Sequence, residues 1–128
     1  MTLAEICMPL MLLVTIGAIA PAKIEGRREY DNANPRDPGF YRTGFRQRAQ
    51  GAHQNSYECL PFFFAAVLLA EFRAAPQGLV DALAVGFVAL RVLYVLCYWT
   101  DRPTARSIVW AAALACNLAL FLLPAWGR

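Results

Sequence analysis

The stretch AHQNSYECLPFFFAAVLLA, residues 52–70, joins a polar segment to an apolar one without a break. Its first seven residues include His53, Gln54, Asn55 and Glu58, whereas the residues that follow, 59–70, carry no charge. The alternation of polar and apolar residues typical of a half-buried strand is absent. The stretch therefore predicts a membrane-spanning helix that has polar groups at its entrance.

The composition of the whole chain also indicates a membrane protein. Of its 128 residues, 59% are hydrophobic and only 16% are charged, whereas soluble domains carry about 25% charged residues. Four apolar segments have the length of about 20 residues that a helix needs to cross roughly 30 Å of hydrocarbon. These predicted spans are about residues 3–22, 49–72, 78–99 and 105–126. We expect an all-α fold, a single membrane domain over residues 1–128 built as an up-down-up-down four-helix transmembrane bundle.

The connections and the basic residues predict how the bundle is oriented. A long polar loop, residues 23–48, follows the first span, and the two later connections are short turns, which join antiparallel neighbours. Nine basic residues lie in or beside the first and third connections, against only Arg73 and Arg128 on the opposite side. Because basic residues favour the cytoplasmic side, we expect the long loop in the cytoplasm and both termini on the non-cytoplasmic side.

Two classes of function are disfavoured by the distribution of charges and cysteines. The basic residues lie at helix ends without interleaved aromatic residues, which argues against a nucleic-acid-binding surface. The cysteines are isolated within the predicted spans and form no pattern with zinc-ligand spacing, so no metal site is expected and apolar packing is the simplest interpretation. The cysteines are Cys7, Cys59, Cys97 and Cys116.

Polar residues within the predicted spans fall on shared helical faces. Such residues are costly in a membrane and usually face the interior of a bundle. Spacings of three, four and seven residues place them on one stripe of each helix. The stripe of the second span is formed by Arg48, Asn55 and Glu58. The stripe of the third span is formed by Arg91, Tyr94 and Tyr98.

The two stripes suggest a half-buried cationic pocket that opens to the cytoplasm and suits a small anion with several carboxylates. Glu58 and Arg91 lie at a similar depth of about 10–15 Å, so we expect them to pair. Arg106 and Ser107 stand at the mouth of the fourth span. Alternatively, a Glu58–Arg91 pair only fixes the helix register, and the tyrosines and arginines near the interface only anchor the helices in the bilayer.

Several motifs resemble those of the MAPEG family, the membrane-associated proteins of eicosanoid and glutathione metabolism. The motifs are RAQGAHQNSYECLPFF at 48–63, RVLYVLCY at 91–98 and TARS at 104–107, and the loop DNANPRDPGFYRTG at 31–44 is similar to that of bacterial members. The resemblance covers Tyr30 to Ser107. It implies a homotrimer in the bacterial inner membrane, with glutathione sites between neighbouring subunits near the cytoplasmic face.

The resemblance also implies roles for single residues. Arg106 matches an arginine proposed to stabilise the glutathione thiolate in the leukotriene and prostaglandin synthases, and Ser107 matches a serine proposed for that role in the prostaglandin E synthase. The positions that match ligand-contacting residues are Arg48, Asn55, Glu58, Arg91, Tyr94 and Tyr98. The chemistry is reasonable, because only a thiolate is a good nucleophile and a guanidinium beside the sulfur favours it.

Two further polar residues, His53 and Asp37, lie outside the two stripes. His53 lies off the stripe of Asn55, and we expect it to have a structural role in helix contacts. Asp37 aligns with a loop aspartate of the prostaglandin E synthase.

The chain also departs from the family pattern, which leaves two functions open. Gly51 and Gln54 stand where glutathione-using relatives carry arginines, and Trp110 replaces a tyrosine. The first function is a glutathione-dependent transferase or peroxidase that uses glutathione as co-substrate, acts on lipophilic electrophiles and serves detoxification. The second is a non-catalytic membrane protein that binds lipid or acts as a scaffold, as the 5-lipoxygenase-activating protein of the family does.

Overall fold

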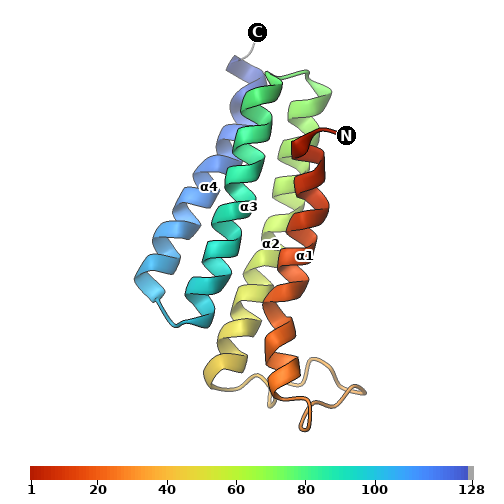
Figure 1. Ribbon diagram of the computed structural model, residues 1–128, viewed down its shortest axis with the longest axis vertical. Coiled ribbons are helices and arrows are strands. Elements are labelled where there is room, and N and C mark those ends of the chain that lie inside the picture. Colours follow the sequence, from red (N-terminus) through yellow and green to blue (C-terminus); the bar gives the residue numbers. More distant parts are fainter. Residues whose placement is uncertain (127–128) are drawn as a thin grey trace.

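The protein consists of four long helices that run side by side (Figure 1). The computed structural model describes residues 1–126, so Arg128, which was counted in the orientation argument, lies outside the described residues. The helices are α1 (Leu3–Glu25), α2 (Gly44–Phe72), α3 (Gln77–Trp99) and α4 (Pro103–Trp126). No strand occurs in residues 1–126. The prediction of an all-α fold with four helices is confirmed.

Three of the helices, α1, α3 and α4, are long and apolar enough to cross a membrane. The chain is therefore a multi-pass integral membrane protein. The remaining helix, α2, is the longest, with 29 residues. Its first half contains Arg46, Arg48, His53 and Asn55, so it is too polar to be counted with the others. It nevertheless runs the length of the bundle beside α1 and α3 (Figure 1).

Small side chains let the helices approach closely. In a membrane, helices associate through packing and not through the hydrophobic effect, which favours alanine and glycine at their contacts. Six alanines of the main core are almost fully buried, namely Ala4, Ala66, Ala70, Ala75, Ala84 and Ala113. Between them, the rings of Phe63 and Phe87 stack with centres 4.4 Å apart. Buried alanines thus contribute to the core from all four helices, and the aromatic stack joins α2 to α3.

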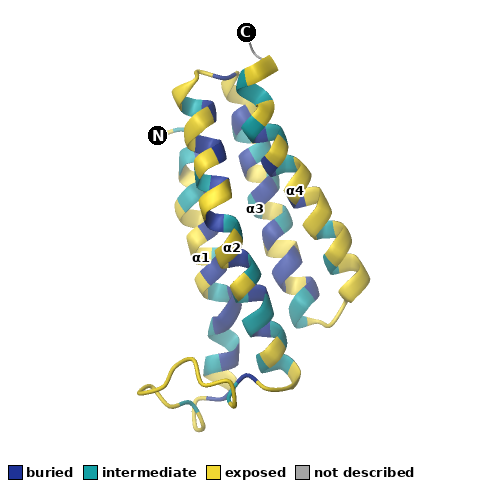
Figure 2. Ribbon diagram, turned by 180° about the vertical axis from the view of Figure 1, so that it is seen from behind, coloured by how far each residue is buried: buried dark blue, intermediate teal, exposed yellow. Residues whose placement is uncertain are grey.

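Helix α4 is the least enclosed of the four. It packs along α3 and also contacts α2, but in the described residues it does not contact α1. Only Ala113, Asn117 and Leu120 of α4 are buried, and most of the helix is exposed in Figure 2. The side of α4 that faces α2 therefore borders an incompletely filled space.

The two ends of the bundle differ in chemistry. At the end that carries both termini, the Thr2 hydroxyl donates to Glu71 at 2.6 Å, and the Ala4 amide donates to Asp81 at 2.9 Å. These bonds tie the start of α1 to the end of α2 and the start of α3. The opposite end carries the loop of residues 26–43 and the turn between α3 and α4 (Figure 1).

Arg46 anchors the long loop to the start of α2. Its guanidinium forms ion pairs with Glu25 at 2.9 Å and Glu29 at 2.6 Å, and it lies 4.6 Å over the Phe40 ring. Gly26 lies beneath this cluster, since a Cβ there would be 2.7 Å from the ring of Phe40. The Arg46 guanidinium holds the pKa of Glu29 below its ordinary value of about 4.5.

We expect the substitution Arg46→Ala to release the loop while leaving the helices intact. Amide hydrogen exchange of residues 26–43 should become several-fold faster, because the described contacts of Arg46 join both flanks of the loop. The pKa of Glu29, followed by NMR titration in micelles, should rise toward its ordinary value. In the wild type, the Arg46–Glu29 contact is complete above that ordinary value and is lost as the pH falls through the lowered pKa.

The matched control is Arg42→Ala, which changes an exposed arginine of the same loop that makes no hydrogen bond or ion pair within residues 1–126. Equal exchange rates in the two variants would show that Arg46 does not hold the loop.

Candidate functional site

Arg91 of α3 is a charged side chain in the interior of the bundle, with only 1% of its surface exposed. Its Nη2 donates to Asn55 Oδ1 at 2.8 Å and to Ser56 Oγ at 3.1 Å, both from α2. The guanidinium carbon also lies 4.0 Å from the centre of the Tyr94 ring. A buried charge needs such partners, because its desolvation is otherwise uncompensated. Arg91 therefore couples α3 to α2.

The expected ion pair between Glu58 and Arg91 is wrong. Glu58 is exposed, and among the described residues Arg91 has no carboxylate partner. The reason is rotational, since each helical residue turns the side chain by about 100°. Asn55 and Ser56 face α3 together, which leaves Glu58 about 60° beyond Asn55 on the far side from Ser56. The two residues agree in depth but differ in direction. Sequence reasoning missed Ser56, which is a partner of Arg91.

Two arginines and two tyrosines form a continuous series, which we call the Arg–Tyr ladder: Arg91, Tyr94, Tyr98 and Arg106. The rings of Tyr94 and Tyr98 meet edge to face with centres 5.7 Å apart. The guanidinium of Arg106, from the first turn of α4, lies 4.4 Å over the Tyr98 ring. Cation–π contacts of this kind are each worth about 0.5–2 kcal/mol. The ladder joins the buried cation of α3 to the half-buried cation of α4.

The remaining predicted site residues lie around this ladder. Arg48 is half-buried, and its Nε and Nη2 both lie 3.4 Å from the carbonyl oxygen of Trp99, at the C-terminal end of α3. These bonds are long and therefore weak. Ser107 is exposed beside Arg106. The structure thus joins Asn55 to the ladder directly and leaves Arg48, Glu58 and Ser107 nearer its periphery.

Gly51 allows Tyr98 to approach the backbone of α2. A Cβ at position 51 would lie 2.6 Å from Tyr98 Cζ and closer still to the hydroxyl oxygen. No real Cβ tolerates such a contact, so the tyrosine would have to move. The absence of a side chain at Gly51 is therefore part of how the ladder is positioned.

His53 and Asp37 both have local structural contacts. His53 Nδ1 lies 2.7 Å from the carbonyl oxygen of Thr15, so it donates a bond that ties α2 to α1. This agrees with the expected structural role. Asp37 lies in the long loop, where its carboxylate accepts a bond from the Gly39 amide at 3.0 Å.

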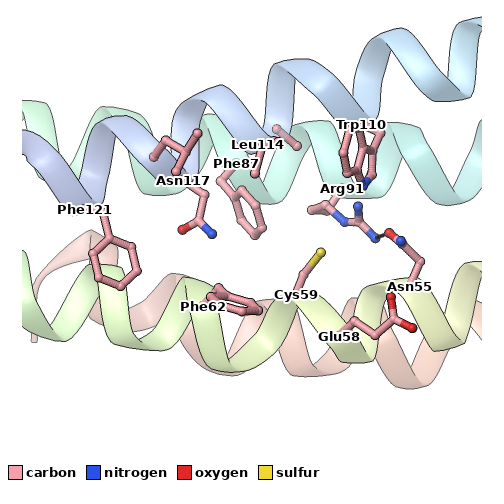
Figure 3. Close-up of a pocket in the computed structure, with 12 residues that line it drawn as sticks. Asn55, Glu58, Cys59, Phe62, Phe87, Arg91, Trp110, Leu114, Asn117 and Phe121 are labelled. Atoms are coloured by element: carbon pink, nitrogen blue, oxygen red, sulfur yellow. Dashed lines mark hydrogen bonds between the residues drawn. The ribbon is translucent and has the colours of Figure 1, made fainter.

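A cavity of about 500 Å³ lies between α2, α3 and α4, next to the buried guanidinium (Figure 3). One end is polar and is lined by Asn55, Glu58 and Arg91. The rest of the wall is mostly apolar and includes Cys59, Phe62, Phe87, Trp110, Leu114 and Phe121. Sequence reasoning did not identify this cavity, because it depends on how α4 packs against the rest of the bundle.

Within residues 1–126, no group of three or more His, Cys, Asp or Glu side chains is placed to hold a metal ion. The groups at the site are cations, a carboxylate, amide and hydroxyl groups, and the side chains of an apolar cavity beside them. This combination suits a polar ligand that meets an apolar one.

Comparison with known proteins gives one match. The family model described as "MAPEG family" matches residues 2–126, which is nearly the whole chain. No curated protein and no solved structure matches the chain.

The substitution Gly51→Ala should disturb the Arg–Tyr ladder. We expect a melting temperature in detergent lower by a few degrees, because about 1 kcal/mol shifts the midpoint of a domain of this size by about 4 °C. The matched control is Gly17→Ala in α1, where an added Cβ meets nothing within 4 Å. There the change should be neutral or stabilising, because alanine favours a helix over glycine.

A double substitution separates the clash from other effects of alanine. In a Tyr98→Ala background, Gly51→Ala should cost nothing, because the ring it would contact is gone. If the cost of Gly51→Ala is the same with and without the Tyr98 ring, the proposed contact is not its cause.

Proposed function

Because the chain belongs to the MAPEG family, we propose that it is a glutathione-dependent transferase or peroxidase that acts on lipophilic electrophiles in the membrane. The family includes such enzymes and also non-catalytic members, so membership alone does not decide the activity. The observation that carries the proposal is the position of Arg106, a half-buried cation stacked on Tyr98 at the end of the Arg–Tyr ladder. A guanidinium held beside a sulfur favours its thiolate form, because the positive charge lowers the pKa of the thiol.

Several groups are suited to hold glutathione near Arg106. Arg48 is bonded only weakly to the Trp99 carbonyl, so it can turn to a ligand carboxylate. The exposed carboxylate of Glu58 at the cavity rim suits the ligand's amine, and the amide of Asn55 suits its peptide groups. Tyr94 and Tyr98 would flank the ligand. The buried guanidinium of Arg91, on the Tyr94 ring, would attract the ligand's negative charge. Ser107 could donate a hydrogen bond to the sulfur.

The proposed reaction begins when Arg106 stabilises the glutathione thiolate. In a transferase step, the sulfur attacks an electrophilic carbon, a sulfur–carbon bond forms, and the leaving group departs with its electron pair. In a peroxidase step, the sulfur attacks the terminal oxygen of a hydroperoxide, the oxygen–oxygen bond breaks, and the alkoxide takes up a proton. The attacking sulfur becomes a sulfenic acid. A second glutathione thiol then attacks this sulfur, the sulfur–oxygen bond breaks, and the disulfide and water are formed.

The apolar cavity beside the polar groups is the natural site for the lipophilic reactant. Its volume of about 500 Å³ lies within the range of small-molecule sites, and its walls are mainly aromatic and aliphatic. The reactant would enter from the bilayer between α2 and α4. Holding both reactants side by side is itself a large part of catalysis.

The second candidate function is a non-catalytic protein that binds lipid or serves as a scaffold. It is favoured by Gly51 and Gln54, which remove two cations that relatives have. In addition, Nη2 of Arg91 is already bonded to the protein. In this case the cavity would hold lipid without a thiol partner.

We further propose that the single domain over residues 1–128 assembles as a homotrimer in a bacterial inner membrane, with the long loop in the cytoplasm. The apolar and poorly enclosed face of α4 supports an assembly of several subunits. The two basic connections, the long loop and the α3–α4 turn, lie at the same end of the bundle, which supports the proposed orientation. A neighbouring subunit would then complete the glutathione site. Native mass spectrometry from detergent gives the subunit number directly.

Binding of glutathione and formation of its thiolate test the proposed activity. We expect isothermal titration calorimetry to detect binding at millimolar glutathione or below, and stopped-flow ultraviolet absorbance to detect the thiolate. Arg106→Ala should raise the pKa of the bound thiol by about 1–3 units, because a cation within a few ångströms lowers it by that amount. Binding itself should weaken less than the thiolate signal.

The control for this experiment is Arg102→Ala, which removes an exposed arginine just before α4. A wild-type protein that neither binds glutathione at millimolar concentration nor forms a thiolate would rule out the enzyme and favour the lipid-binding alternative. An unchanged signal in Arg106→Ala would move the role to another residue such as Ser107.

A further inference from the structure

Asn117 is a polar side chain in the apolar part of α4, residues 108–126. Only 7% of its surface is exposed, and its Oδ1 has no hydrogen-bond partner within the described residues. It lines the cavity between α2, α3 and α4, and Figure 3 shows its carboxamide directed into this space beside Phe87. A buried acceptor without a partner is costly in free energy. We therefore expect Asn117 Oδ1 to accept a hydrogen bond from a donor that does not belong to the described residues.

The position of Asn117 relative to Arg106 is well defined by the helix. The two residues are eleven positions apart, which corresponds to three full helical turns plus a rotation of about 20° around the helix axis. They therefore lie on the same face of α4, about 16 Å apart along its axis. Trp110 and Ala113 lie on this face between them. A chain-like ligand that lies along α4 could reach both residues.

The surroundings of Asn117 restrict the chemistry of its partner. Residues 107–126 contain no charged side chain, so a charged group at this depth would be uncompensated. The neighbouring cavity walls are Phe87, Leu114, Leu118 and Phe121, none of which can donate a hydrogen bond. A second atom without a partner, Nε of Arg91, lies at the polar end of the same cavity region. The cavity thus favours an elongated apolar ligand with a neutral donor at the depth of Asn117.

We propose that Asn117 is a specificity residue that accepts a hydrogen bond from a hydroxyl group on the chain of a lipid bound in this cavity. The hydroxyl lies about 16 Å from the end of the ligand that reaches Arg106. That the end at Arg106 reacts rests on the proposed function. The hydrogen bond at Asn117 does not, and it would serve a non-catalytic lipid-binding protein equally well.

Binding of matched fatty acids tests the proposal without glutathione. The probes are stearate, its 12-hydroxy derivative and its 2-hydroxy derivative, each competing with radiolabelled stearate for the protein in nanodiscs. The wild type should bind the 12-hydroxy acid about two- to ten-fold more tightly than stearate, which is the range of one net hydrogen bond. The 2-hydroxy acid should gain nothing, since its hydroxyl lies beside the carboxylate.

The informative variant is Asn117→Leu, which removes the acceptor and nearly conserves the volume. It should fold, because it replaces a buried polar group without a partner by an apolar one. Its preference for the 12-hydroxy acid should disappear while stearate binds at least as well. The control Leu114→Ala, on the same wall, should weaken both acids equally and keep their ratio.

Three results would overturn the proposal: no preference for the 12-hydroxy acid in the wild type, the same preference in Asn117→Leu, or an equal gain from the 2-hydroxy acid. Native mass spectrometry of Asn117→Leu covers another possibility. If the assembly dissociates and the lipid preference is unchanged, the partner of Asn117 is a neighbouring subunit and not a ligand. If Asn117→Leu does not fold, Asn117→Ala also removes the acceptor, and an unchanged preference for the 12-hydroxy acid there would likewise count against the proposal. Failure of glutathione binding leaves this test intact, so the two proposals can fail separately.

Discussion

Burial of the Arg91 guanidinium is the constraint on which the arrangement of the site depends. Inside a membrane bundle, neither lipid nor apolar side chains can satisfy a charged group, so its partners must come from neighbouring helices. Asn55 and Ser56 supply oxygen atoms from α2, and the Tyr94 ring covers one face of the guanidinium. These contacts fix how α3 is rotated against α2. The same rotation brings Tyr98, about two turns from Arg91 along α3, against the backbone of α2 at Gly51.

The position of Tyr98 then determines where α4 can place a cation. The turn between α3 and α4 is short, so the first turn of α4 lies beside the last turn of α3. Arg106 reaches the Tyr98 ring across this corner and becomes held there. Beyond the corner, α4 packs along α3 but contributes few buried residues, and the side toward α2 remains partly open. The short α3–α4 turn therefore places the cation Arg106 against Tyr98, and the packing of α4 along α3 leaves the apolar cavity beside α2.

The sequence predicted those features that depend on local constraints. Helix length and short turns predicted four helices, because bilayer thickness and antiparallel connection act on each segment separately. Spacing along α3 predicted that Arg91, Tyr94 and Tyr98 share a face, and the structure joins them in one ladder. The pairing of Arg91 with Glu58 was wrong, because equal depth says nothing about rotation. Asn117 was missed, although its spacing of eleven residues from Arg106 marks a shared face. The cavity itself depends on tertiary packing that no local pattern contains.

The absence of an arginine at position 51 has a different meaning once Tyr98 is considered. A side chain at that position and the present position of the phenol exclude each other, so Gly51 permits close contact between α2 and α3 where the family resemblance led us to expect a cation. A carboxylate of a bound ligand must then find another cation on this face. Arg48 lies three residues earlier, about one turn further toward the loop, and is held only by two bonds of 3.4 Å. The nearest cation on this face of α2 is therefore Arg48, about 4.5 Å further along the axis than position 51. Gly51 consequently argues against a ligand carboxylate bound at position 51, and the proposed thiol ligand would place its carboxylate about one helical turn further out, near Arg48.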